Sequence, residues 1–438
     1  MAYGCPMQML RGLKALAHDA VDWTTELVRD GHESSARAVM RVLGRIEPLA
    51  EVSKDVDETR RLITDGVLGT VRGVNRAAQK LTDATLDALD SQTLDSQSQL
   101  RDSAPAALPL RSDAFGSLPW LSDAALGVLN GTVGHYLHSA KNPLDLGMKI
   151  RFGAGYLPDE PEELARSLRT ARPRVALFLH GLSATEWSWC FDGATYYGDP
   201  GASFGALLER DLGYTPLYLR YNSGRHVSEN GRELAALLER VVDALPAPVE
   251  EVLLVGHSMG GLVARSACHY ASLENRSWVS HVKRVFSIGT PHRGAPLEKL
   301  GALVTATLGA IDAPGTRIPA RILAGRSSGM KDVRGGALVD EDWLGRDLDC
   351  FDTPQMTAIP LLPNARYYFI CATVTRDPAH PLGQLVGDLL VRVPSASGTR
   401  AEGHTFPIEV HTHGGLLHHQ LQNHPAVYEQ LRKACSDA

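Results

Sequence analysis

The stretch from Val252 to Arg265 constrains the fold more than any other part of this chain. A short apolar run at 252–255 is followed by Gly-His-Ser-Met-Gly-Gly and then by a segment with helical spacing. A strand, a tight turn and a helix in this order predict a nucleophile elbow that presents Ser258. Glycines at 256 and 260 avoid collisions in such a strained turn. The plain alternative is a glycine-rich packing turn in which the serine has no chemical role.

The rest of the chain from about residue 148 alternates apolar runs with amphipathic segments. This pattern predicts an α/β fold, with a mostly parallel central sheet and helices on both faces. The expected strands are residues 148–152, 175–179, 216–221, 252–255, 282–288 and 366–375. The expected helices are residues 120–138, 160–168 and 232–245, together with the one after the elbow. Ligands of such sheets bind beyond the carboxyl ends of the strands, where Ser258 would lie.

Three regions are predicted along the chain. Residues 1–90 have helical periodicity with a break at Pro48, and we expect a helical hairpin or bundle. Residues 91–114 form a polar linker that contains proline, and residues 115–438 form the α/β domain. Within it, lid or cap segments are expected near 185–205 and 295–362. An alternative role for the N-terminal helices is peripheral contact with a lipid surface, or self-association.

Composition excludes several classes of function. The net charge of −6 argues against a nucleic acid held by a basic surface. The sequence has no apolar stretch of membrane-spanning length and no signal-peptide core at its start. Its six cysteines lack CxxC spacing, which favours reduced thiols and therefore a cytoplasmic location. There is no phosphate-binding loop, and the predicted chemistry needs no cofactor.

A serine nucleophile needs a histidine base, and the base needs an orienting acid. In elbow-bearing folds these partners follow the serine in the order acid, then histidine. Asp377 and Asp388 both follow the last expected strand. The candidate bases in the C-terminal region are His404, His411, His413, His418, His419 and His424. The first oxyanion donor is expected to be the backbone N–H of Met259, directly after the nucleophile.

Residues 174–434 resemble the α/β-hydrolase superfamily, in particular the bacterial triacylglycerol-lipase and PGAP1-like esterase group. The matching segments are HGL at 180–182, GHSMGG at 256–261, GTPHRG at 289–294, GDLLV at 387–391 and HHQLQNHPAVYEQL at 418–431. The resemblance implies Asp388 as the acid, His418 as the base and the N–H of Leu182 as the second oxyanion donor. The sequence departs from the group at Leu389, usually Gly, and at Gln422, usually Leu. Asp377 and His419 therefore stay open as rivals.

Other histidines and an aromatic segment have plainer interpretations. We expect His257 to pack at the elbow, His180 to bond within its own loop, and His292 to line the site or cap a strand. His404, His411 and His413 have no suitably spaced partner of cysteine or carboxylate type, so no metal site is predicted. The aromatic-dense loop at 185–198 suits an apolar pocket or a lid.

The function predicted from these residues is hydrolysis of carboxylic esters, in the manner of an esterase or lipase. A Ser258–Asp388–His418 triad would act through an acyl-enzyme on a small-molecule or lipid ester. One alternative is acyl transfer or thioester hydrolysis by the same triad. An alternative of a different class is an interaction protein that uses its N-terminal helices on a non-catalytic scaffold.

Overall fold

The computed structural model describes residues 118–295, 327–346, 356–397 and 408–436, with a few single positions before residue 118. The chain divides into two compact units, Met1–Ala106 with Asn142–Leu144, and Ala107–Lys141 with Asp145–Ala438. The second unit contains the sheet. The predicted helical region at 1–90, the linker at 91–114 and most of the cap segment at 295–362 lie outside the described residues. The proposed domain boundaries stay predictions.

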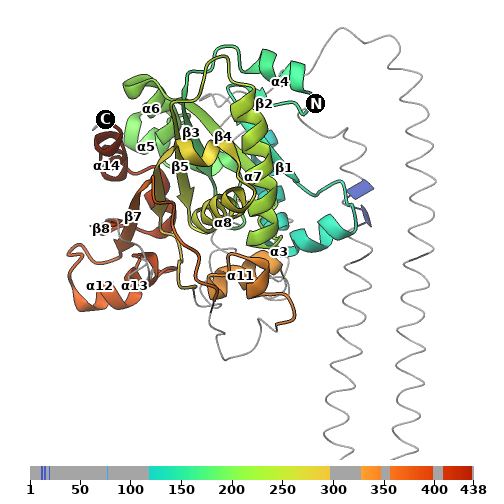
Figure 1. Cartoon of the computed structure of the whole chain (residues 1–438). Coiled ribbons are helices and arrows are strands. Elements are labelled where there is room, and N and C mark those ends of the chain that lie inside the picture. Colours follow the sequence, from blue (N-terminus) through green and yellow to red (C-terminus); the bar gives the residue numbers. More distant parts are fainter. Residues whose placement is uncertain are drawn as a thin grey trace, which may run out of the picture. The chain divides into compact units, whose positions relative to one another are not determined.

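An eight-stranded sheet forms the centre of the second unit, in the order β2-β1-β4-β3-β5-β6-β7-β8 (Figure 1). Its strands are β1 (Met148–Phe152), β2 (Gly155–Tyr156), β3 (Arg174–Leu179), β4 (Thr215–Tyr221), β5 (Glu251–His257), β6 (Val282–Ile288), β7 (Arg366–Thr373) and β8 (Ile408–Gly414). β1 pairs antiparallel with β2 and β4, and the remaining pairs are parallel. The predicted α/β-hydrolase fold class is confirmed.

Helices cover both faces of this sheet. The α-helices are α3 (Leu118–Ser139), α4 (Pro161–Ser167), α5 (Gly193–Tyr197), α6 (Phe204–Leu212), α7 (Val227–Asp243), α8 (Met259–Leu273), α11 (Ser328–Gly335), α12 (Pro381–Val386), α13 (Val393–Ala396) and α14 (Pro425–Ser436). Short 3₁₀ helices are η2 (Glu186–Cys190), η3 (Ser277–His281), η4 (Asp340–Asp342) and η5 (His418–Gln422). Among the described residues, no helix combines the length and apolar character needed to cross a membrane.

The core divides into two layers because side chains of a strand alternate between its faces. In β3, Leu177 and Leu179 pack in the layer that contains the buried faces of α7 and α8. Phe178, between them, packs in the opposite layer with residues of α6 and α14. A strand that is buried on both faces has a continuous run of apolar residues, which is why β3 could be predicted from the sequence.

Among the differences from the sequence prediction, two concern the bounds of an element and one concerns a whole strand. α7 begins at Val227, five residues before the expected start, because the Glu229 side chain accepts the His226 N–H at 3.2 Å and caps the helix. β7 ends at Thr373 rather than at residue 375. β8 was not expected, because it is a polar strand at the edge of the sheet and lacks a buried apolar run.

Candidate active site

Ser258 lies in the turn between β5 and α8, in a strained backbone conformation. Its φ of 54° and ψ of −125° are unusual for a residue with a side chain. Its N–H donates to the Ile288 carbonyl at 2.8 Å, which fixes the turn against β6. A Cβ on Gly256 would lie 2.5 Å from the Gly261 Cα, and one on Gly260 would collide with the Leu179 carbonyl. The glycines are therefore required by close backbone contacts.

Asp388 and His418 form a buried pair. His418 Nδ1 lies 2.7 Å from Asp388 Oδ2, and the two side chains are 3% and 1% exposed. The His418 N–H also donates to the Asp388 carbonyl at 3.2 Å. The other carboxylate oxygen, Oδ1, accepts the N–H groups of Leu390 and Val391 at 3.0 and 2.8 Å. Both oxygens of this carboxylate are thus engaged, and its orientation is fixed.

The loop that holds Asp388 explains one departure from the resembled group. Leu389 has a φ of 79°, in the left-handed region where glycine is favoured. The leucine is 51% exposed, so its side chain meets no crowding that would add to the strain. A leucine is therefore accommodated where the group usually carries glycine, at the cost of local backbone strain.

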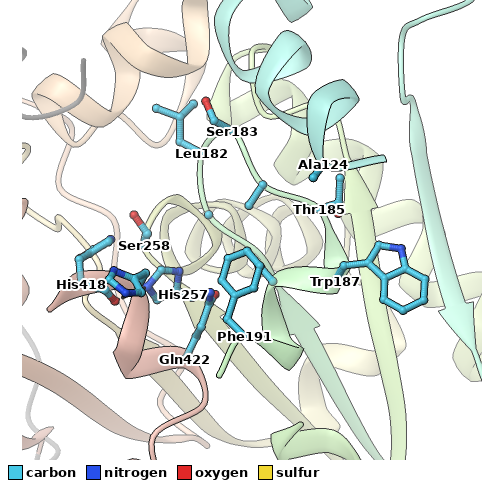
Figure 2. A pocket seen from close by; sticks show the side chains of 14 residues that line it. Ala124, Leu182, Ser183, Thr185, Trp187, Phe191, His257, Ser258, His418 and Gln422 are labelled. Carbon is cyan, nitrogen blue, oxygen red and sulfur yellow. Dashed lines mark hydrogen bonds between the residues drawn. The ribbon is translucent and has the colours of Figure 1, made fainter. Parts of the chain in front are cut away.

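Ser258 and His418 line one cavity of about 60 Å³ (Figure 2). His418 Nε2 is buried and makes no hydrogen bond within the part of the chain that the structure describes. The histidine ring lies against Gly289, whose φ is +57° and where a Cβ would be 3.0 Å from His418 Cε1. With Nδ1 donating to Asp388, Nε2 is the ring nitrogen that can accept a proton.

The two rival residues have different surroundings. Asp377 is exposed, and its carboxylate accepts the Ala379 N–H at 2.9 Å within its own loop. His419 lines the same cavity as Ser258 but is exposed and has no carboxylate partner among the described residues. Neither rival has the carboxylate–imidazole contact that joins Asp388 to His418.

Two backbone N–H groups lie where oxyanion donors were expected. Met259 is the first residue of α8, so its N–H has no acceptor within the helix. Leu182 follows Gly181, where a Cβ would lie 3.0 Å from the Ser258 Cβ. Neither N–H donates a hydrogen bond within the described residues. The loop after β3 is held by the Ser183 N–H, which donates to Ser223 Oγ at 3.0 Å.

Three histidines near the elbow have supporting roles, and of these His180 and His257 are buried and His292 is half-buried. His180 Nδ1 donates to the Gly181 carbonyl at 2.8 Å, as expected, and burial lowers its pKa to about 4. His257 Nε2 donates to the His418 carbonyl at 3.1 Å, and burial lowers its pKa well below its usual value. His292 stacks on Phe369, with ring centroids 4.3 Å apart, and does not line the cavity. All three are neutral side chains that brace backbone or rings.

The C-terminal histidines show no metal centre in the described residues. His413 Nε2 contacts Gln430 Oε1 at 3.2 Å, and His411 lies 3.7 Å from a Glu409 oxygen. His404 lies outside the described part of the chain. No group of three His, Cys, Asp or Glu side chains suited to a metal occurs where the structure is described.

The aromatic loop after β3 contributes to the cavity only in part. Trp187 and Phe191 belong to its lining, but the Trp187 indole points away from Ser258 (Figure 2). Trp189 is fully buried and packs on Phe178, with ring centroids 5.1 Å apart. The loop is anchored at Glu186, which is 0% exposed. The expected lid role of residues 185–205 stays a prediction.

The anchor of this loop is a buried cluster of charges that the sequence did not indicate. Glu186 accepts hydrogen bonds from Arg151 at 3.0 Å and from Arg220 at 2.7 Å. Tyr156 donates to the same carboxylate at 2.6 Å, and Arg220 also pairs with the buried Asp123. The two guanidinium groups lower the pKa of Glu186 to about 2 against the opposing effect of burial. The cluster joins β1, β2, β4 and α3 to the loop.

Comparison with known proteins supports the resemblance found in the sequence. The model of the PGAP1-like alpha/beta domain matches residues 207–307, which include the elbow. No curated protein matches the chain in sequence.

Several solved structures overlap the chain at low identity. Lipase BlEst2 from Bacillus licheniformis is 17% identical, with 60% of this chain and 91% of that chain covered and a TM-score of 0.39. Esterase Pf2001 from Pyrococcus furiosus is 14% identical, with 60% and 79% covered and a TM-score of 0.34. The type II thioesterase YbtT of the yersiniabactin pathway is 14% identical, with 61% and 92% covered and a TM-score of 0.34. Scores at this level support no conclusion about substrate. By its own sheet and elbow, the chain has the α/β-hydrolase fold, and its elbow-bearing segment resembles the PGAP1-like alpha/beta domain.

Proposed function

We propose that this protein is a serine hydrolase of carboxylic esters, with Ser258 as nucleophile, His418 as base and Asp388 as orienting acid. One observation carries the proposal. His418 donates from Nδ1 to a buried carboxylate at 2.7 Å, its Nε2 makes no hydrogen bond within the described residues, and its side chain lines the cavity that Ser258 also lines. A serine, an imidazole in the right tautomer and a fixed carboxylate are the parts that nucleophilic acyl transfer needs.

The proposed reaction has two acyl-transfer steps. Ser258 Oγ attacks the ester carbonyl carbon while His418 Nε2 takes the serine proton, and Asp388 stabilises the resulting imidazolium. The carbonyl oxygen becomes an oxyanion that accepts the N–H groups of Leu182 and Met259. The C–O bond to the alcohol then breaks, and His418 returns the proton to the leaving oxygen. Water, deprotonated by His418, attacks the acyl-enzyme and releases the acid and free Ser258.

The size of the cavity supports a short substrate group. A volume of about 60 Å³ is small beside the 300–1,000 Å³ of typical drug-sized ligand pockets. It holds a few water-sized groups, which matches an acyl or alkoxy part of a few heavy atoms. A small-molecule ester is therefore the proposed substrate.

The buried free thiols Cys190, Cys268, Cys371 and Cys435 support the proposed cytoplasmic location.

A chain-length series tests the proposal. Hydrolysis of p-nitrophenyl acetate, butanoate, octanoate and dodecanoate by the full chain should give the highest kcat/KM for the two shortest esters. Ser258→Ala should abolish turnover, and His418→Ala should lower it far more than His419→Ala, the matched neighbouring variant. A folded wild type without activity on any ester would contradict the proposed function. A larger loss in His419→Ala would overturn the choice of base.

A further inference from the structure

Five side chains in the cavity wall carry a buried polar atom without a partner among the described residues: Ser183, Trp187, Ser188, His418 and Gln422. His418 belongs to the proposed triad, and the Trp187 indole points away from Ser258 (Figure 2). Ser183 Oγ lies against α3, where a Cβ on Gly131 would collide with it. Ser188 and Gln422 are the two that remain.

Gln422 is 2% exposed, and its amide oxygen Oε1 is buried and makes no hydrogen bond within the described residues. Ser188 is also 2% exposed, and its Oγ is buried without a partner among these residues. Both residues line the cavity that contains Ser258 and His418. Because buried amides and hydroxyls in native proteins are nearly always hydrogen-bonded, this pair is an exception that calls for a physical reason.

The position of Gln422 points to the ligand rather than to the fold. It is the last residue of η5, the short helix that begins with His418. Figure 2 shows its amide end beside Phe191, on the cavity side. A leucine, the usual residue in the resembled group, fills a similar volume and leaves no unpaired amide. The amide therefore contributes nothing evident to packing. The free-energy cost of burying it unpaired is offset only when a bound group forms a hydrogen bond with it.

The other lining residues restrict which group this is. Apart from histidine, no side chain that can carry a charge lines the cavity in the described part of the chain. A carboxylate or ammonium would enter without an opposite charge, which is costly. A hydroxyl is neutral, donates one hydrogen bond and accepts others, so it can pair with an amide and a serine together.

On these grounds, and resting on the proposed ester hydrolysis, we propose that Gln422 and Ser188 make this cavity selective for esters that carry a hydroxyl group close to the ester bond. The hydroxyl can belong to the acyl chain or to the alcohol. In either case it satisfies polar atoms that an alkyl group of the same shape leaves unpaired. Sites that hydrogen-bond a substrate hydroxyl discriminate strongly against analogues that lack it, for this reason.

The test compares pairs of esters that differ only by hydroxyl against methyl. For the acyl arm these are the p-nitrophenyl esters of 3-hydroxybutanoate and 3-methylbutanoate. For the alcohol arm they are 2-hydroxyethyl butanoate and propyl butanoate, whose hydrolysis is measured by the release of butanoic acid. In one arm, the wild type should prefer the hydroxyl ester by roughly 5- to 100-fold in kcat/KM, the range expected for one unpaired buried polar group. The arm that shows the preference identifies where the hydroxyl lies.

Variants assign the preference to these residues. Gln422→Leu should remove most of it and raise kcat/KM for the methyl ester, a gain that misfolding cannot produce. Ser188→Ala, which removes only a hydroxyl group, should also reduce the preference. Ser287→Ala is the matched control, because Ser287 Oγ is also buried without a partner in the described residues but lies outside the cavity lining. It should keep the wild-type preference.

Ester hydrolysis with no hydroxyl preference in either arm would overturn the inference and leave the proposed function standing. Retention of the full preference in both Gln422→Leu and Ser188→Ala would overturn it as well. Absence of hydrolysis for all four esters, together with failure of Ser258 to react with a fluorophosphonate, would refute the proposed function itself.

Discussion

The substitution Asp388→Asn tests the geometry of the base most sharply. The Asp388 Oδ1 accepts two backbone N–H groups, from Leu390 and Val391. In the variant the amide oxygen must stay on these donors, because an NH₂ group there would face two N–H groups. The NH₂ group of the asparagine then faces His418 Nδ1 in place of Oδ2. His418 must accept at Nδ1 and carry its proton on Nε2, the tautomer that cannot take a proton from serine.

The expected loss follows from this tautomer. In another serine hydrolase system the same change lowers kcat by about 10⁴ with the geometry intact, and we expect a loss of that order here. The effect on stability should be modest. The side chain keeps its shape and its two backbone hydrogen bonds, and exchanging one charge-assisted bond costs about 1–3 kcal/mol. A domain with the usual 5–15 kcal/mol of stability stays folded after such a change.

The assay is kcat/KM on p-nitrophenyl butanoate, together with the rate of fluorophosphonate labelling, both at pH 7.5. The control is Asp377→Asn, because Asp377 is the rival acid and its carboxylate caps only its own loop. It should retain activity within about twofold, as expected for an exposed position. The reasoning is refuted if Asp388→Asn retains more than a tenth of wild-type activity, or if Asp377→Asn causes the larger loss.

Three further outcomes are expected. Gly289→Ala should lower kcat up to about 100-fold and stability by about 1–2 kcal/mol, because its φ is +57° and the new Cβ would press on His418; unchanged kinetics would contradict this. His257→Phe should lower kcat about tenfold by leaving the His418 carbonyl unpaired, and an unchanged kcat would count against its positioning role. Burial lowers the pKa of His180 to about 4, so below pH 6.5 the unfolded chain takes up a proton that the folded chain does not. Stability should therefore fall on acidification, by about 2 kcal/mol between pH 6.5 and 5 from this residue, and denaturant unfolding of His180→Phe should show a flatter pH profile.

The elbow could be predicted because its determinants are local. A strand, three glycines and a serine lie within a few residues, and the close contacts of Gly256 and Gly260 follow from the tight turn they form. The partners of Ser258 depend on loops that return from far along the chain. By position alone, Asp377 follows β7 more directly than Asp388 does. Resemblance to a family, rather than periodicity, selected Asp388.

Other features could not be inferred because they depend on tertiary packing. β8 is paired on one side only, so it carries polar residues and does not show the pattern of a buried strand. The charge cluster around Glu186 joins residues up to 97 positions apart, and nothing in their local sequence indicates that they meet. The unpaired amide of Gln422 was visible only as a departure from the resembled group, and its surroundings give that departure a chemical meaning.

The most direct test of the central claim is covalent labelling of the active serine. The full chain is treated with a fluorophosphonate probe, and the modified peptide is identified by mass spectrometry. The account predicts one adduct, on Ser258, that is absent from Ser258→Ala and forms far more slowly in His418→Ala. A folded protein that does not react, or that reacts equally well after Ser258→Ala, would contradict it.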